Sequence, residues 1–133
     1  MTELKTTPFS YNKAKGFSLI ELMIAAGVLA IILAIALPMY TDYVDTARVG
    51  VMNNNVETVR LFEEDYRLSE GTYVDGTYDP ADPDAVGGLK SLLGWEPRTG
   101  DDSITYVVDN ASATGFRVTA TDDSGETVTK TYP

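Results

Sequence analysis

The chain has 133 residues, ten basic and twenty acidic side chains, a formal net charge of −10, and neither cysteine nor histidine. This length allows one modest domain, and the excess of acids disfavours a nucleic-acid surface, because phosphate binding depends on lysine and arginine. The missing residue types exclude disulfides, zinc sites built on thiolate or histidine, and catalysis by Ser-His-Asp or Cys-His arrangements.

Residues 1–16 form a polar segment with three lysines and one acid, Glu3. The positive-inside bias predicts that this segment stays in the cytoplasm. From Leu22 to Thr41 no residue is charged, and a helix of about 20 residues crosses about 30 Å of hydrocarbon. This run exceeds the apolar stretch of about 7 to 15 residues in a secretory signal peptide. A simple single-span anchor is the remaining rival interpretation.

Glu21 stands directly before the uncharged run, behind the basic segment. A carboxylate near the bilayer centre costs about 2.5 to 3.5 kcal/mol on insertion scales, so such residues tend to face a partner and mark function. A position near the interface and close to the lysines would lower this cost before assembly, but the carboxylate still needs a cation. We therefore expect Glu21 to find a cation elsewhere.

The string GFSLIE, from Gly16 to Glu21, resembles the type III signal of type IV prepilins and pseudopilins. That signal has a glycine, a cleavage point, a phenylalanine and a glutamate at the fifth position after the cut, and Lys15 and Pro38 also match it. The resemblance implies that a prepilin peptidase cuts between Gly16 and Phe17 and methylates the new amine of Phe17. It also implies that Glu21 pairs with the N-terminal amine of a neighbouring subunit, which neutralises both charges as the subunit leaves the lipid.

The function implied by this resemblance is that of a structural subunit of a type IV pilus, not an enzyme, with no cofactor and no metal. Its partners would be copies of the same pilin, the prepilin peptidase and the pilus assembly machinery, without direct nucleic-acid binding. The precursor would cross the inner membrane once and end in an extracellular filament. A minor pilin or a secretion-system pseudopilin stays open, as does a single-span membrane enzyme or binding protein, which the absence of histidine and cysteine disfavours.

A long helix is predicted from about residue 17 to about residue 68, apolar on all sides at first and one-sided later. Pro38 should kink it, and the resemblance implies that the stretch between Gly27 and Pro38 unwinds on assembly. Glu63 is expected to form a helix-surface pair with Arg67, four residues later. The predicted core face of the second half consists of Val44, Ala47, Met52, Val56, Val59, Phe62 and Tyr66.

The predicted fold class is α+β, with residues 17–41 as the membrane or filament-core helix and residues 42–133 as a soluble headgroup. Residues 69–100 are rich in glycine, aspartate, proline and tyrosine, which predicts a loop, and the resemblance implies a variable, subunit-contacting surface there. An apolar patch should hold this loop on the core: Leu89, Leu92, Leu93 and Trp95. Three strand-like runs predict an antiparallel meander on the helix: residues 103–109, 115–122 and 126–132.

Three further functions are compatible with groups of these residues, and each group also has a simpler structural interpretation. An acidic loop could hold calcium, although the EF-hand spacing is absent and a solvated loop is favoured: Asp75, Asp79, Asp82 and Asp84. Aromatic side chains could carry electrons, although packing is their commoner role: Phe17, Tyr40, Tyr43, Phe62 and Tyr66. The tripeptide Asn110-Ala111-Ser112 matches an N-glycosylation acceptor, which in a bacterial pilin is usually a chance match.

Overall fold

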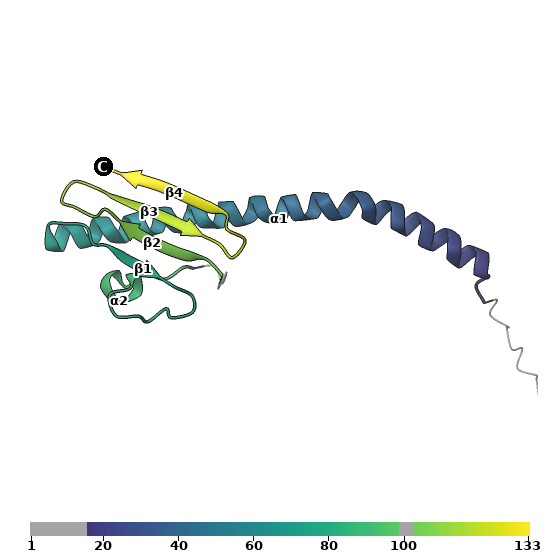
Figure 1. The fold of residues 1–133 in the computed structure, drawn as a ribbon, viewed down its shortest axis with the longest axis horizontal. Helices are drawn as coiled ribbons and strands as arrows, with labels where there is room; N and C mark the ends of the chain where they lie inside the picture. Colours follow the sequence, from purple (N-terminus) through teal and green to yellow (C-terminus); the bar gives the residue numbers. More distant parts are fainter. Residues whose placement is uncertain (1–15, 99–102) are drawn as a thin grey trace, which may run out of the picture. The chain divides into compact units, whose positions relative to one another are not determined.

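A computed structural model describes residues 16–98 and 103–133 of the chain (Figure 1). Most of the predicted leader, residues 1–15, therefore lies outside the described residues. The chain divides into two compact units, Met1–Tyr40 and Thr41–Pro133. Its elements, in order, are α1 (Leu19–Glu70), β1 (Gly76–Tyr78), α2 (Leu89–Leu93), β2 (Thr105–Asp109), β3 (Phe116–Thr121) and β4 (Thr127–Tyr132).

The helix α1 confirms the prediction of one long N-terminal helix, with its two ends within two residues of the predicted ones. It continues as helix through Pro38, although proline has no N–H to donate to the carbonyl of Ala34. The stretch from Gly27 to Pro38 is helical throughout in this isolated chain. The unwinding predicted for the assembled filament concerns another state and stays a prediction.

The second half of α1 buries one narrow stripe: Met52, Asn55, Val56, Val59 and Glu63. The prediction was right for Met52, Val56 and Val59 and wrong for Phe62, which is 41% exposed. A stripe on a helix advances by three and four residues alternately, so the position after Val59 on the same line is Glu63. The predicted surface pair of Glu63 with Arg67 is also wrong, because Glu63 is fully buried and Arg67 bonds Glu64 at 3.3 Å.

The sheet is antiparallel with the order β1-β2-β3-β4, so the three predicted strands are present and pair as predicted (Figure 1). The prediction of three strands in all was wrong, because β1 adds a fourth from within the predicted loop. This strand is three residues long, Gly-Thr-Tyr, between Asp75 and Asp79. Such a length shows no alternation of polar and apolar residues, and its flanking residues are typical of turns.

The headgroup core lies between the sheet and the second half of α1. Alternate residues of the two central strands are buried, in the pattern that one face of a sheet requires. The same core takes in the predicted loop patch through Leu89 and Trp95, which are 0% and 1% exposed. The indole N–H of Trp95 donates to the hydroxyl of Thr58 on α1 at 2.9 Å. The buried residues of these strands are Tyr106 and Val108, then Phe116, Val118 and Ala120, and Ile104 is buried directly before β2.

Two glycines let α2 lie close to β1. A Cβ atom at Gly76 would come within 2.9 Å of the Leu89 side chain, and one at Gly88 within 2.9 Å of the Thr77 carbonyl oxygen. Real Cβ atoms essentially never approach other atoms so closely. The short strand β1 and the short helix α2 are therefore closely packed on each other at the edge of the sheet.

Candidate functional site

The N-terminus of α1 is capped by Ser18, the residue before the first helical one. Its hydroxyl oxygen accepts a hydrogen bond from the backbone N–H of Glu21 at 3.3 Å, and its carbonyl accepts the N–H of Leu22 at 3.2 Å. Serine at the cap with glutamate three residues later is the capping-box spacing. A carboxylate in the first turn also interacts favourably with the positive end of the helix dipole. Glu21 thus has a local structural role beside the predicted one in assembly.

The predicted processing residues and the predicted docking carboxylate lie together at this helix end. Gly16, Phe17, Ser18 and Glu21 line one open hollow of about 320 Å³. Phe17 is 85% exposed, and Glu21 is exposed as well. Sequence analysis missed Ser18, which the serine-to-glutamate spacing alone would have identified.

The other two predicted site residues, Gly27 and Pro38, lie farther along α1 and do not line this hollow. They stand within a helix that is long and apolar enough to cross a membrane by length and composition. In the first half of this helix the large apolar side chains are exposed on every side; Leu22, Ile31 and Met39 are 66%, 67% and 68% exposed. So large an apolar surface requires a cover, and lipid or other protein chains are the possible ones.

In the acidic loop, the carboxylates act as internal hydrogen-bond acceptors. Asp75 accepts the N–H of Ala111 at 2.8 Å, and Asp79 accepts the N–H of Ala81 at 2.9 Å. Asp84 forms an ion pair with Lys90 at 3.0 Å. Among the described residues, no group of three or more acidic side chains is placed to hold a metal ion. The calcium alternative therefore gains no support from the geometry.

Two networks tie the β3–β4 hairpin to the second half of α1. In the first, Asp122 accepts three hydrogen bonds within its own turn and one from Arg48 at 3.3 Å. The Ser124 hydroxyl, the backbone N–H of Glu126 and Arg48 hold the pKa of Asp122 below its ordinary value, although burial opposes them.

In the second network, the carboxylate of Glu57 accepts Lys130 at 2.8 Å and the Tyr132 hydroxyl at 3.2 Å. The hydrogen bond from Lys130 is the main cause that lowers the pKa of Glu57. Burial, together with the neighbouring Glu57 charge, raises the pKa of Tyr132 to about 12. Both networks therefore remain intact at neutral pH.

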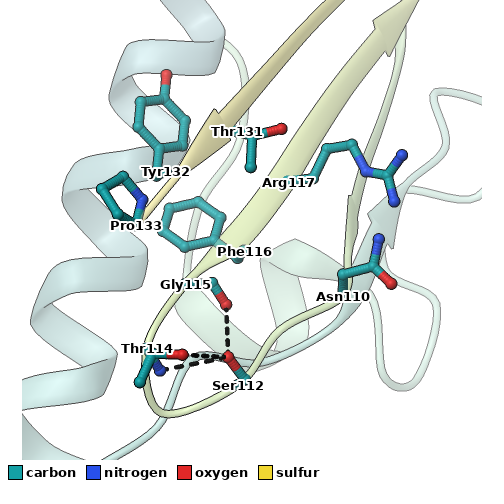
Figure 2. A pocket seen from close by; sticks show the side chains of 9 residues that line it. All are labelled: Asn110, Ser112, Thr114, Gly115, Phe116, Arg117, Thr131, Tyr132 and Pro133. Carbon is teal, nitrogen blue, oxygen red and sulfur yellow. Dashed lines mark hydrogen bonds between the residues drawn. The ribbon is translucent and has the colours of Figure 1, made fainter.

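A surface hollow of about 400 Å³ lies beside the β2–β3 turn and the C-terminal residues, and Figure 2 shows the residues that line it. Asn110 begins this turn with a left-handed backbone, φ 57°. The Ser112 hydroxyl donates to the Gly115 carbonyl at 3.1 Å and accepts the Thr114 N–H at 3.2 Å. The hollow is shallow and lined by neutral side chains apart from Arg117, which binds Asp109 at 2.8 Å.

Comparison with known proteins indicates the same family for the N-terminal segment and for most of the chain. A family model described as the prokaryotic N-terminal methylation motif matches residues 11–37. A fimbrial protein of Moraxella nonliquefaciens is 32% identical over 108 residues, which cover 78% of this chain and 70% of the relative. The fimbrial protein EcpC of Eikenella corrodens is 33% identical over 107 residues, 80% of this chain and 61% of the relative. The type IV major pilin protein PilE1 of Neisseria gonorrhoeae is 39% identical over 59 residues, 44% of this chain and 36% of the relative. The search of solved structures found no match.

Proposed function

The chain belongs to the type IV pilin family, and on that premise we propose a route by which it enters a pilus. The chain is a structural subunit, as its fimbrial relatives are. The observation that carries this conclusion is an apolar, unburied helix that begins at the matched methylation motif and continues into a self-sufficient headgroup. Relatives named as fimbrial proteins and major pilins favour a pilus subunit over a pseudopilin.

The first step of the route is removal of residues 1–16 by a prepilin peptidase, which cuts between Gly16 and Phe17 and methylates the new amine of Phe17. The exposed Phe17 side chain and the open hollow around it support access by such an enzyme. Before this step the precursor is anchored in the inner membrane by residues 17–41. Afterwards the assembly machinery moves it into the extracellular filament.

In the second step, Glu21 of one subunit meets the Phe17 amine of its neighbour. The amine exists only after cleavage, so processing makes assembly possible. Both groups leave the membrane interface for an apolar filament core. A buried pair that loses one partner is destabilised by about 3 to 5 kcal/mol, because the remaining charge is left uncompensated. This loss would be repeated at every subunit of the filament.

Helical polymerisation follows from this head-to-tail contact, since heterologous contacts whose rotation does not close generate open filaments. We propose that the stretch from Gly27 to Pro38 unwinds as the helices pack. Pro38 already leaves one backbone carbonyl without its usual helical donor, and Gly27 is a poor helix former. Hydrogen exchange of this stretch should be faster in sheared filaments than in detergent-solubilised subunits. Equal protection in both states would contradict the proposed unwinding.

Because Glu21 stands at the capping-box position and its backbone N–H is bonded to Ser18, the decisive experiment must separate the charge of Glu21 from helix capping. Glu21→Gln keeps the side-chain shape and the capping spacing but removes the charge. Ser18→Ala removes the cap, at a cost of about 1 kcal/mol, and keeps the charge. We expect Glu21→Gln cells to hold the processed subunit in the membrane without surface filaments, and Ser18→Ala cells to make filaments.

The readouts are the amount of sheared filament, the amount of membrane-bound subunit and the mass of its N-terminus. Normal filaments from Glu21→Gln cells would overturn the docking step. Loss of filaments in Ser18→Ala cells with normal subunit levels would show that helix capping, not charge, governs assembly. An N-terminus that retains the leader in wild-type filaments would overturn the processing step.

A further inference from the structure

Glu63 is a buried carboxyl group that takes no part in the proposed route of filament assembly. It lies on the core stripe of α1 and is 0% exposed, next to residues of the apolar cluster. Its Oε2 atom accepts the backbone N–H of Val74 at 3.1 Å. Its Oε1 atom is buried and has no hydrogen-bond partner among the described residues. An ionised carboxylate in such a position is strongly disfavoured, whereas a neutral carboxyl group is tolerated.

The segment that Glu63 holds connects three parts of the headgroup. Residues 73–75 follow the turn after α1 and lead into β1. The Tyr73 N–H donates to the Ser112 carbonyl at 3.2 Å, and the Asp75 carboxylate accepts the Ala111 N–H at 2.8 Å. The segment is thus bound to α1 on one side and to the β2–β3 turn on the other. That turn lines the surface hollow of Figure 2.

The surroundings of Glu63 favour its neutral form. Burial is the main cause that raises the pKa of Glu63 to about 7, and the negative charge of Asp75, on the packed segment, acts in the same direction. The hydrogen bond from Val74 opposes them but is weaker than burial. The next residue of α1, Glu64, is bonded to Arg67 at 3.3 Å and to the Tyr73 hydroxyl at 2.8 Å.

The nearby strands also carry charged side chains, but these are paired with each other. Arg117 on β3 binds Asp109 on β2 at 2.8 Å. On α1, Arg60 binds Glu57 at 3.7 Å and lies 5.1 Å from the ring centre of Tyr132. Among the described residues, no cation contacts the Glu63 carboxyl group.

We propose that Glu63 is a proton-controlled latch for the segment 73–75 and, through it, for the β2–β3 turn. With a proton on the carboxyl group, the latch is closed and the segment is held against α1. When the proton leaves, the ionised carboxylate is more stable in water than in the core, so the contact with Val74 opens. The exposed surface around residues 110–115 then becomes more mobile. This subunit surface would therefore change its mobility around neutral pH, whether the subunit is free or assembled.

Hydrogen exchange of the full-length chain in detergent, measured by mass spectrometry at pH 5.5 and pH 8, tests this proposal. After correction for the intrinsic pH dependence of exchange, we expect opening of segments 73–76 and 111–115 to increase by about 25-fold. This value follows from a carboxyl group with pKa about 7 when closed and 4.5 when open. The central strand β3 should not change.

Two variants complete the test. Glu63→Gln keeps an acceptor for Val74 and cannot ionise, so its exchange in both segments should be the same at both pH values. Glu70→Gln removes an exposed carboxylate at the end of α1 and should behave like the wild type. The proposal would be overturned by hydrogen exchange that does not depend on pH in the wild type, or by an unchanged pH dependence in Glu63→Gln.

A direct titration covers the case in which Glu63→Gln does not fold. Carboxyl carbon resonances of the wild-type chain, labelled at glutamate, should include one group that titrates near pH 7. If every glutamate carboxyl titrates below about pH 5.5, near the ordinary value, the latch does not exist.

Discussion

The most discriminating stability prediction concerns two adjacent carboxylates that contact the same guanidinium group. Asp122 lies 3.3 Å from Arg48 Nη1 and Asp123 lies 3.2 Å from it, so their distances are nearly equal. Their environments differ, because the Asp122 side chain is 2% exposed and the Asp123 side chain is 65% exposed. Burial, not distance, should therefore decide how much each contributes.

The magnitude follows from the hydrogen bonds of each group. Asp122→Asn keeps an oxygen for the backbone N–H groups of the turn but turns an amide N–H toward Arg48. Breaking a buried pair costs about 3 to 5 kcal/mol, and the 29% exposure of Arg48 and its second partner reduce this. We expect a loss of about 2 kcal/mol. For Asp123→Asn, an exposed pair, we expect less than about 1 kcal/mol.

Thermal unfolding of the full chain in detergent measures both variants. For a headgroup of this size, about 2 kcal/mol lowers Tm by about 8 to 16 °C. Because the pKa of Asp122 is lowered in the folded state, its contribution is present above the ordinary value of 3.8 and is lost as pH falls through the lowered value. The difference between the two variants should therefore shrink in strong acid. Equal Tm losses for Asp122→Asn and Asp123→Asn at neutral pH would refute the argument from burial.

Two other outcomes follow from the packing of α2 and from the buried carboxyl group. In denaturant titrations, Gly88→Ala should destabilise the headgroup more than Gly76→Ala. The new Cβ at residue 88 meets the backbone oxygen of Thr77, whereas the one at residue 76 meets the movable side chain of Leu89. The reverse order would show that β1 and α2 separate easily. The contribution of Glu63 to the free energy of unfolding should be fully present below about pH 4.5 and should be lost as pH rises to about 7, which lowers the stability by up to about 3 kcal/mol, because the folded pKa of Glu63 is raised. Denaturant titrations across this range should show no such fall for Glu63→Gln, and a wild-type stability that is flat between pH 4.5 and 7 would exclude the raised pKa.

Sequence alone predicted the parts of this fold that repeat a pattern over many residues. The long helix and the three strands β2 to β4 extend over enough residues for their periods to be distinguished. The fourth strand, β1, has three residues and depends on its partner β2 and on the close approach of α2. A structure made by contacts distant in sequence leaves no local period, which is why this region was predicted as a loop.

The candidate site was predictable where motif spacing carries chemical information. Gly16, Phe17 and Glu21 were identified from their order in the sequence, and the structure places them around one hollow. The capping role of Ser18 was not predicted, although the spacing from Ser18 to Glu21 is that of a capping box. Glu63 was misassigned because glutamate is almost never fully buried, so composition favours the surface even at a core position.

The two halves of α1 differ in how their charged groups are paired and in how their apolar side chains are covered. In the second half, Glu57 is paired with Lys130 of β4, Arg48 is paired with Asp122 of the β3–β4 turn, and the apolar stripe is covered by the strands. In the first half, neither condition is met within one chain, since the apolar side chains are exposed and Glu21 has only a backbone contact with the cap among the described residues. A single copy is therefore complete as a headgroup and incomplete as a helix. Lipid can cover the apolar surface, but in the proposed route a neighbouring subunit with a cleaved N-terminus would also supply a positive charge for Glu21, and this difference would favour the filament over the membrane.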